Sequence, residues 1–256
     1  MGGTRPVLHM FYRSHFNEKA RWALDWKGVE HRRQAYLPGP HAPMIRRLSG
    51  QTATPVLVMD GRVIAGSAAI IDALERLHPD RPLYPQDSAL RDQALSIQRE
   101  WDAEVGPAVR TLVFAEMIHE PDYLCATFAD RKPYPKRVAY RAAFPLARGL
   151  MARAHHTDDP DAVVRAAETT RRALDFVEHS VGASGQLVGE AFSVADLCCA
   201  ALLGPLVRDI PHPDMAKPEP VPERVETFLA GWSEHPALHW ARDQYARHRS
   251  PASAPR

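Results

Sequence analysis

Short apolar runs and helical periodicities alternate over the first eighty residues. Residues 7–12 form a compact apolar and aromatic run, which predicts a buried strand. From residue 16 to Gly28 the apolar positions recur at helical spacing with charged residues between them, and Gly28 is suited to end that helix. Residues 31–36 predict a second, weaker strand, and residues 44–48 predict a short helix.

The most informative pattern lies in residues 54–71. Pro55 precedes an apolar run, and Asp60-Gly61 separates that run from a second one. An Asp-Gly pair between two apolar runs predicts a β-hairpin, and a proline suits the first position of a strand because it lacks a donor. Residues 67–77 predict an amphipathic helix directly after the hairpin. The order β-α-β-α-β-β-α requires a mixed sheet, parallel at the helical crossovers and antiparallel at the hairpin.

Beyond a proline-rich linker, the pattern predicts helices and no strand. Residues 88–117 predict one long helix that is interrupted or kinked at Gly106-Pro107. Residues 119–137 contain several prolines and aromatic residues and predict an ordered loop. Further helices are predicted over residues 139–154, 161–181 and 223–248.

A helix start is marked at residues 193–196. The Ser193 hydroxyl is expected to bond the backbone amide of Asp196, whose carboxylate reaches back to the Ser193 amide. Phe192 and Leu197 supply the hydrophobic staple, and the apolar run 197–203 follows. We expect this capping box to be structural and to carry no chemistry.

Composition limits the classes of partner and compartment. The net charge of the 256 residues is +1, and basic and acidic residues are mixed, which argues against nucleic acid or a membrane as a partner. Three cysteines, two of them adjacent at Cys198-Cys199, cannot form a disulfide framework and fit a reducing cytosol. No apolar run is long enough to span a bilayer and no signal-peptide core is present. These features predict a soluble cytoplasmic protein.

Four segments together resemble the glutathione S-transferase superfamily. They are residues 12–24, 54–57, 66–70 and 192–197, in the order and spacing of that family. The resemblance extends to about Arg249. It implies an α/β thioredoxin-like domain over residues 1–80, a linker over 81–86 and an all-α helical domain over 87–249. Residues 250–256 are expected to form a disordered tail.

The resemblance implies a thiol-binding site in the N-terminal domain. It implies that Pro55 is in the cis form and that the backbone of Thr54 pairs with the cysteinyl part of glutathione. Ser67 would bind the γ-glutamyl carboxylate, which agrees with the affinity of a helix N-terminus for anions. Ser14 occupies the place of the residue that contacts the glutathione sulfur in the serine-type and cysteine-type members. Phe16, beside it, is a further candidate to touch the thiol or its acceptor.

Ser14 would stabilise the nucleophile and would not attack by itself. Hydroxyl and amide donors at a positive helix end lower the pKa of a bound thiol, so a larger fraction of it is thiolate at neutral pH. A serine at this place is also an ordinary helix N-cap, so the structural alternative stays open. In the tyrosine-type members the tyrosine lies earlier on the strand, in the register of Met10.

Three departures from the family pattern bear on the ligand. Gly66 stands where the family usually has Glu, Gln or Asp, which removes a side chain that helps to hold the γ-glutamyl end. Residues 49–52 replace the usual Asn-Pro-x-Gly approach to the proline. Serine at position 14, in place of cysteine, argues against covalent glutathionyl chemistry and against a thiol-disulfide oxidoreductase.

Other candidate residues also have purely structural interpretations. The candidates for an acceptor-substrate pocket, each of which is also compatible with a core position, are Tyr12, Trp101, Val105, Arg110, Phe114 and Tyr123. His155 and His156 with Asp158 and Asp159 are better interpreted as solvated surface than as a metal site, because adjacent histidines on a helix point to different sides. No metal is expected.

The leading hypothesis is an enzyme that delivers the thiolate of glutathione, or of a related thiol, to an electrophilic apolar small molecule. Conjugation, dehalogenation, ether cleavage and isomerisation all remain open, and the resemblance implies a homodimer. The alternative is a non-catalytic protein of the same fold that serves as a binding or interaction module, which Gly66 favours.

Overall fold

The computed structural model describes residues 5–249. Its N-terminal part is built on one mixed sheet of four strands in the order β2-β1-β3-β4. β1 runs parallel to β2 and antiparallel to β3, and β3 and β4 form an antiparallel hairpin, as predicted. The turn residues Asp60 and Gly61 both have positive φ, which the two central residues of a type I′ turn require. The strands are β1 (Val7–Met10), β2 (Arg32–Ala35), β3 (Val56–Met59) and β4 (Arg62–Ala65).

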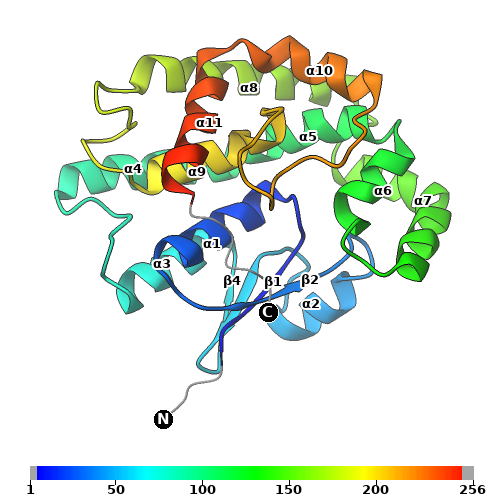
Figure 1. Ribbon diagram of the computed structural model, residues 1–256, viewed down its shortest axis with the longest axis horizontal. Helices are drawn as coiled ribbons and strands as arrows, with labels where there is room; N and C mark the ends of the chain where they lie inside the picture. The colour runs from blue at the N-terminus through cyan, green and yellow to red at the C-terminus, as the bar shows by residue number, and fades with distance from the viewer. Residues whose placement is uncertain (1–4, 250–256) are drawn as a thin grey trace.

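Three helices accompany this sheet, and all three were predicted from the pattern. They are α1 (His15–Trp26), α2 (Ala42–Ser49) and α3 (Ser67–Leu77). α1 and α3 pack against each other, and their apolar side chains share one core with the sheet. Figure 1 shows this unit below the layer formed by the remaining helices.

Beyond β4, the described chain up to residue 249 contains helices and no strand, as predicted. The helical part starts with α4 (Ser88–Glu100), a π-helical segment (Trp101–Val105) and α5 (Gly106–Met117), and continues through α6 (Pro121–Ala129), α7 (Tyr134–Ala154), α8 (Pro160–Ser180), α9 (Val194–Leu203), a short 3₁₀ turn (Gly204–Leu206), α10 (Glu223–Ser233) and α11 (Pro236–His248). In the described residues, no helix is both long enough and apolar enough to cross a bilayer.

Two predictions about this part need correction. The interruption of the first long helix is the π-helical segment Trp101–Val105, one turn ahead of Gly106-Pro107, and the chain resumes as α5 there. Residues 119–137 do not form a loop, since α6 occupies Pro121–Ala129 and α7 begins at Tyr134. Their prolines open helices instead of breaking them, because a proline in the first turn removes a backbone donor that has no partner there anyway.

α9 is the centre of the helical part, and all ten of its residues are buried. It packs against α1 from the N-terminal unit and against α4 and α11. The predicted capping box is present: the Ser193 hydroxyl caps the helix start and the Asp196 carboxylate accepts from the Ser193 amide at 2.8 Å. Asp196 also accepts from the Leu187 amide at 2.7 Å, so it ties the preceding loop to the helix.

α1 carries charged side chains into the core. Glu18 and Arg21 are fully buried and form an ion pair at 2.6 Å. The other carboxylate oxygen of Glu18 accepts from Arg249, which follows α11, at 2.8 Å. Burial alone would raise the pKa of Glu18, but the charges of Arg249 and Arg21 outweigh it and the pKa is lowered. Lys19 is likewise buried and pairs with Asp102 of the π-helical segment.

The same network continues at the C-terminal end of α1. Arg249 also contacts Asp25 at 2.7 Å, and Arg33 of β2 bridges Asp25 and Asp214 at 2.7 and 2.6 Å. Asp214 lies in the segment between α9 and α10, which is drawn in orange in Figure 1 and extends down towards α1. Segments more than 180 residues apart in the sequence are therefore joined by buried charges.

α7, in contrast to α1, is mostly exposed and carries apolar side chains on its surface. It lies beside α6 at one end of the helical layer (Figure 1), and Phe144 is its only buried residue within the described chain. Four large apolar side chains on it are exposed, namely Tyr134, Val138, Leu146 and Leu150.

Candidate functional site

A cavity of about 210 Å³ opens between the loop that leads into α1 and the helical part. Its floor comes from the β1–α1 loop and from Ala53 and Thr54, which precede β3. Its walls come from α5, α6 and residues 205–218, with His155 at the end of α7. Aromatic and aliphatic side chains dominate the lining, as in most small-molecule sites.

Ser14 lies at the cavity as the N-cap residue of α1. Its backbone is extended and its carbonyl oxygen accepts from the Glu18 amide at 2.8 Å, as expected of an N-cap. Its hydroxyl, however, makes no capping hydrogen bond. Within the described residues the hydroxyl is therefore available to a ligand, next to the unpaired amides at the positive end of the helix.

Arg13 fixes the loop that presents Ser14. Its φ of 54° places it in the left-handed region, and its side chain holds this unusual conformation by three contacts. The guanidinium pairs with Asp130 at 2.6 Å and donates to the carbonyl oxygens of Ala216 and Thr127 at 2.6 and 2.9 Å. The loop is thus clamped to α6 and to the segment between α9 and α10.

His15 joins the start of α1 to the start of α5. Its Nε2 lies 2.9 Å from the Gly106 carbonyl oxygen, so this nitrogen carries the proton. Burial, assisted by the charge of Arg110, lowers the pKa of His15 to about 3, and the ring is neutral at pH 7. A neutral histidine in this place acts as a structural donor and not as a general acid or base at neutral pH.

Phe16 and Gly106 lie in close contact between the two parts of the molecule. A Cβ atom at Gly106 would lie 2.5 Å from Cζ of Phe16 and 3.2 Å from Cδ2 of Leu202, so any larger residue would have to displace the Phe16 ring. The π-helical segment ends at this residue, and such bulges often occur at functional sites. Here it brings the backbone of α5 against the cavity-lining ring of Phe16.

The hairpin supplies the remaining part of the predicted thiol site. The Thr54–Pro55 bond is cis, as the resemblance implies. The Thr54 hydroxyl accepts from the Asn17 side chain of α1 at 3.2 Å, which couples this residue to the helix that starts at Ser14. Gly66 has a φ of 96°, a conformation that side-chain-bearing residues rarely adopt, and its amide donates to the Pro55 carbonyl oxygen at 2.9 Å. Ser67 is the first residue of α3 and is buried.

The structure places the predicted site residues in two groups. Six of them line the cavity, namely Ser14, Phe16, Thr54, Arg110, Phe114 and Tyr123. Pro55, Gly66 and Ser67 lie next to Thr54 along the hairpin and at the start of α3, outside the lining of this cavity.

Three predicted pocket residues lie elsewhere, and this corrects the sequence-based expectation. Trp101 and Val105 belong to the π-helical segment, are nearly fully buried and join the main core, because that face of the segment packs on α8 and α9. Tyr12 packs against the same core and is covered by the Arg131 guanidinium at 4.4 Å from its ring.

Sequence reasoning missed most of the other lining residues, and two of them are titratable side chains that lie outside every predicted motif, His155 and Lys217. His155, expected on a solvated surface, lines the cavity with its ring 4.1 Å from that of Phe114, and burial lowers its pKa to about 4. Lys217 also lines the cavity, and burial lowers its pKa to about 7. No local motif marks either residue, because both reach the site through the path of the chain between helices.

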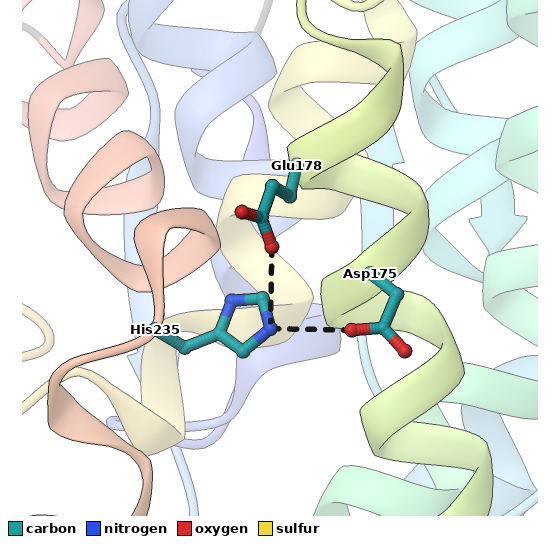
Figure 2. Close-up of side chains that lie close together, drawn as sticks. All are labelled: Asp175, Glu178 and His235. Atoms are coloured by element: carbon teal, nitrogen blue, oxygen red, sulfur yellow. Dashed lines mark hydrogen bonds and ion pairs between the residues drawn. The ribbon is translucent and has the colours of Figure 1, made fainter.

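The cysteines and the polar cluster on α8 do not form part of this site. Cys198 and Cys199 are buried, and burial raises the pKa of Cys198 to about 12, so neither thiol is nucleophilic at neutral pH. Asp175 and Glu178 of α8 lie 3.4 and 3.8 Å from Nε2 of His235 (Figure 2). Nδ1 of His235 accepts from the Ala237 amide, so Nε2 keeps its proton and donates, whereas a metal-bound histidine donates through its other nitrogen. The cluster is a polar link between α8 and α11.

Comparisons with known proteins agree with this architecture. Residues 8–82 match the family described as glutathione S-transferase, N-terminal domain. Over 99 residues, 38% of this chain and 46% of the relative, the sequence is 35% identical to a probable maleylacetoacetate isomerase of Caenorhabditis elegans. The chain spans about half the length of the curated relatives it matches.

Solved structures extend the likeness to nearly the whole chain. The beta-etherase LigF of Sphingobium sp. strain SYK-6 is similar over 94% of this chain and 100% of its own, with a TM-score of 0.63 and 18% identity. A glutathione S-transferase of Methylobacterium radiotolerans, solved in complex with glutathione sulfonate, is similar over 97% and 96%, with a TM-score of 0.62 and 19% identity. At these identities the structures establish a shared fold.

The sheet, the helical part and the cleft between them define a thioredoxin-like domain joined to an all-helical one. Residues 8–82 match the glutathione S-transferase N-terminal domain family, and the whole chain shares the fold of the solved glutathione S-transferases.

Proposed function

We propose that this protein is an enzyme that binds glutathione, or a related low-molecular-weight thiol, beside Ser14. It delivers the thiolate to an electrophilic, largely apolar small molecule in the adjoining cavity. The observation that carries this proposal is the Ser14 hydroxyl, which lines the cavity at the start of a helix and makes no capping bond. The solved relative that holds glutathione sulfonate supports the choice of thiol.

For this reaction the protein has to position the two reactants and lower the pKa of the bound thiol. The thiol loses its proton to solvent, and the Ser14 hydroxyl donates to the resulting thiolate. The sulfur then forms a bond to the electrophilic carbon while the bond to a leaving group breaks and that group departs with its electron pair. In an isomerisation, which the name of the C. elegans relative suggests, the sulfur adds and is later expelled, so the thiol is regenerated.

Ser67 and Thr54 complete the proposed thiol site. The amides that open α3 favour the γ-glutamyl carboxylate because the helix dipole and the unpaired N–H groups act together. Gly66, which stands in place of a longer polar residue, is suited to its φ of 96° without strain, so its effect is confined to the lost side-chain contact.

The test is a calorimetric titration with reduced glutathione, followed by turnover of an activated aryl halide. Lowering the thiol pKa by one unit increases the thiolate fraction about tenfold below that pKa. We therefore expect Ser14→Ala to retain most of the binding and to lose about tenfold in turnover at pH 6.5. Ser88→Ala, at the exposed start of α4, is the matched control and should change neither quantity.

Two outcomes would contradict the proposal. Absence of binding at millimolar glutathione and at the same concentration of related thiols would exclude a thiol-dependent enzyme. Unchanged turnover in Ser14→Ala would remove Ser14 from the mechanism.

A further inference from the structure

The cavity has an unbalanced charge. Two arginines, Arg13 and Arg110, reach its wall together with Lys217, whose pKa burial lowers to about 7, and no acidic side chain lines it among the described residues. The rest of the wall is mostly apolar and aromatic, and its remaining polar residues are uncharged at pH 7, namely Ser14, Thr54, Thr127, His15 and His155. A cation in such a place must find a partner or carry a large desolvation cost.

Arg13 and Arg110 differ in what they bind. Every nitrogen of the Arg13 guanidinium has a partner, including the Asp130 carboxylate at 2.6 Å. Arg110, by contrast, has no hydrogen bond and no ion pair within residues 5–249, and its Nε atom is buried without a partner. The ring of Phe16 lies 5.9 Å from the guanidinium carbon.

The groups around Arg110 do not supply a negative charge either. The neighbouring rings of His15 and His155 are neutral at pH 7 because burial lowers their pKa values to about 3 and about 4. Burial is also what lowers the pKa of Arg110 itself, with no carboxylate raising it. Lys217 donates to the Val207 carbonyl oxygen and forms no ion pair in the described chain.

We propose that the cavity takes an acceptor with an aromatic or other apolar body and a carboxylate, and that Arg110 binds this carboxylate. The inference rests on the proposed function for the identity of the acceptor, but the subsite itself does not depend on the thiol. The planar guanidinium presents paired N–H donors that match a carboxylate, and such charge-assisted pairs are the strong ones. The apolar body would then pack between Phe16, Phe114 and Phe128.

A carboxylate of glutathione is the competing occupant of Arg110. The proposed thiol site, however, places the γ-glutamyl carboxylate at the amides that open α3, outside the lining of this cavity, whereas Arg110 extends from α5 and lines it beside Phe114 and His155. The two occupants are distinguished by which ligand loses affinity when Arg110 is changed.

The experiment needs no turnover and no thiol. The wild-type protein is titrated by calorimetry with 4-ethylbenzoate and, separately, with the uncharged 4-ethylbenzamide, which has nearly the same shape. We expect the carboxylate to bind at least about tenfold more tightly, as a charge-assisted pair in a largely apolar cavity predicts. Arg110→Gln should abolish that preference. Arg110→Lys should keep part of it, because the positive charge remains but the paired N–H donors of the guanidinium are lost.

Arg148→Gln is the matched control, since Arg148 is exposed on α7 away from the cavity wall, and it should keep the full preference. Equal binding of carboxylate and carboxamide by the wild type would overturn the proposal without any variant. So would a preference that survives in folded Arg110→Gln, or a loss of glutathione affinity in that variant with benzoate binding unchanged. If glutathione does not bind but the benzoate preference holds, the proposed function fails and the carboxylate subsite stands.

Discussion

α1 and α7 reverse the usual assignment of polar and apolar residues. α1 buries Glu18, Lys19 and Arg21 completely, whereas α7 exposes Leu146 and Leu150 to solvent. Hydrophobic periodicity alone would place charges outside and leucines inside in both helices. The position of a helix in the assembly therefore decides here which of its residues are buried.

The difference follows from what surrounds each helix. α1 packs on α3 and α9 and shares a core with the sheet, so nine of its twelve residues are buried, and its buried charges are tolerated because each one finds a partner. α7 packs mainly against α6 and has one buried residue, Phe144. The Ser14 site is therefore built on a helix that is largely buried, whereas in the described residues α7 reaches the cavity only through His155 at its end.

Glu18→Gln should have the largest effect on the free energy of unfolding. The change leaves Arg21 without its carboxylate and Arg249 with one partner fewer, and breaking a buried pair costs about 3–5 kcal/mol. Urea denaturation at pH 7 measures it. The matched surface change is Asp72→Asn, which removes an exposed pair within α3 and should cost less than about 1 kcal/mol.

This loss should also depend on pH. The folded-state pKa of Glu18 lies below its usual value, so its contribution is complete above pH 4.5 and disappears as the pH falls through the lower folded-state pKa. The difference between wild type and Glu18→Gln should therefore be full at pH 7 and shrink in acid. A constant difference down to pH 3 would mean that the charge of Glu18 is not what stabilises α1.

Gly106→Ala should have an intermediate effect because the added Cβ meets the Phe16 ring at 2.5 Å. Phe16 must move towards the cavity that it lines, and we expect a loss of about 1–3 kcal/mol in stability together with weaker binding of aromatic ligands. Gly149→Ala is the matched control. Gly149 lies inside α7 with nothing within 4 Å of the added atom, so the same substitution should stabilise by about 0.5–1 kcal/mol. If both substitutions changed the free energy of unfolding in the same direction, the proposed contrast between tightly packed Gly106 and exposed Gly149 would be wrong.

Leu146→Gln with Leu150→Gln should have the smallest effect. Both side chains are exposed, at 88% and 72%, and surface substitutions usually change stability by no more than about 0.5 kcal/mol. Thermal unfolding measures it, with Phe144→Ala on the buried face as the comparison, for which about 3–5 kcal/mol is expected. A large loss in the double variant would show that another surface covers these leucines.

The elements of the N-terminal unit could be predicted because their causes are local. Asp60-Gly61 fixes the hairpin, Gly28 has the positive φ expected just after a helix, and α3 occupies the residues that its amphipathic pattern predicts. The capping box at Ser193 was likewise predictable from four consecutive residues. Each of these features depends on backbone geometry within a few positions.

The helical part was harder to predict where its causes are distant. Prolines in residues 119–137 indicate a break when taken alone, but two of them lie in the first turns of α6 and α7. At the site, Ser14 and Thr54 follow from the motif of the superfamily, whereas Lys217 comes from a proline-rich segment with no pattern of its own. The same holds for the partners of α1, since nothing near Glu18 in the sequence indicates that Arg249 lies against it.

The contact between Glu18 and Arg249 has a consequence for the order in which the chain is made. Synthesis proceeds from the N-terminus, and domains often fold as they emerge. Residues 5–77 contain the whole sheet, but the arginine that completes their buried carboxylate is translated 231 residues after Glu18. A nascent N-terminal unit on the ribosome would thus hold an incompletely neutralised acid in its core until Arg249 has been synthesised and can reach it.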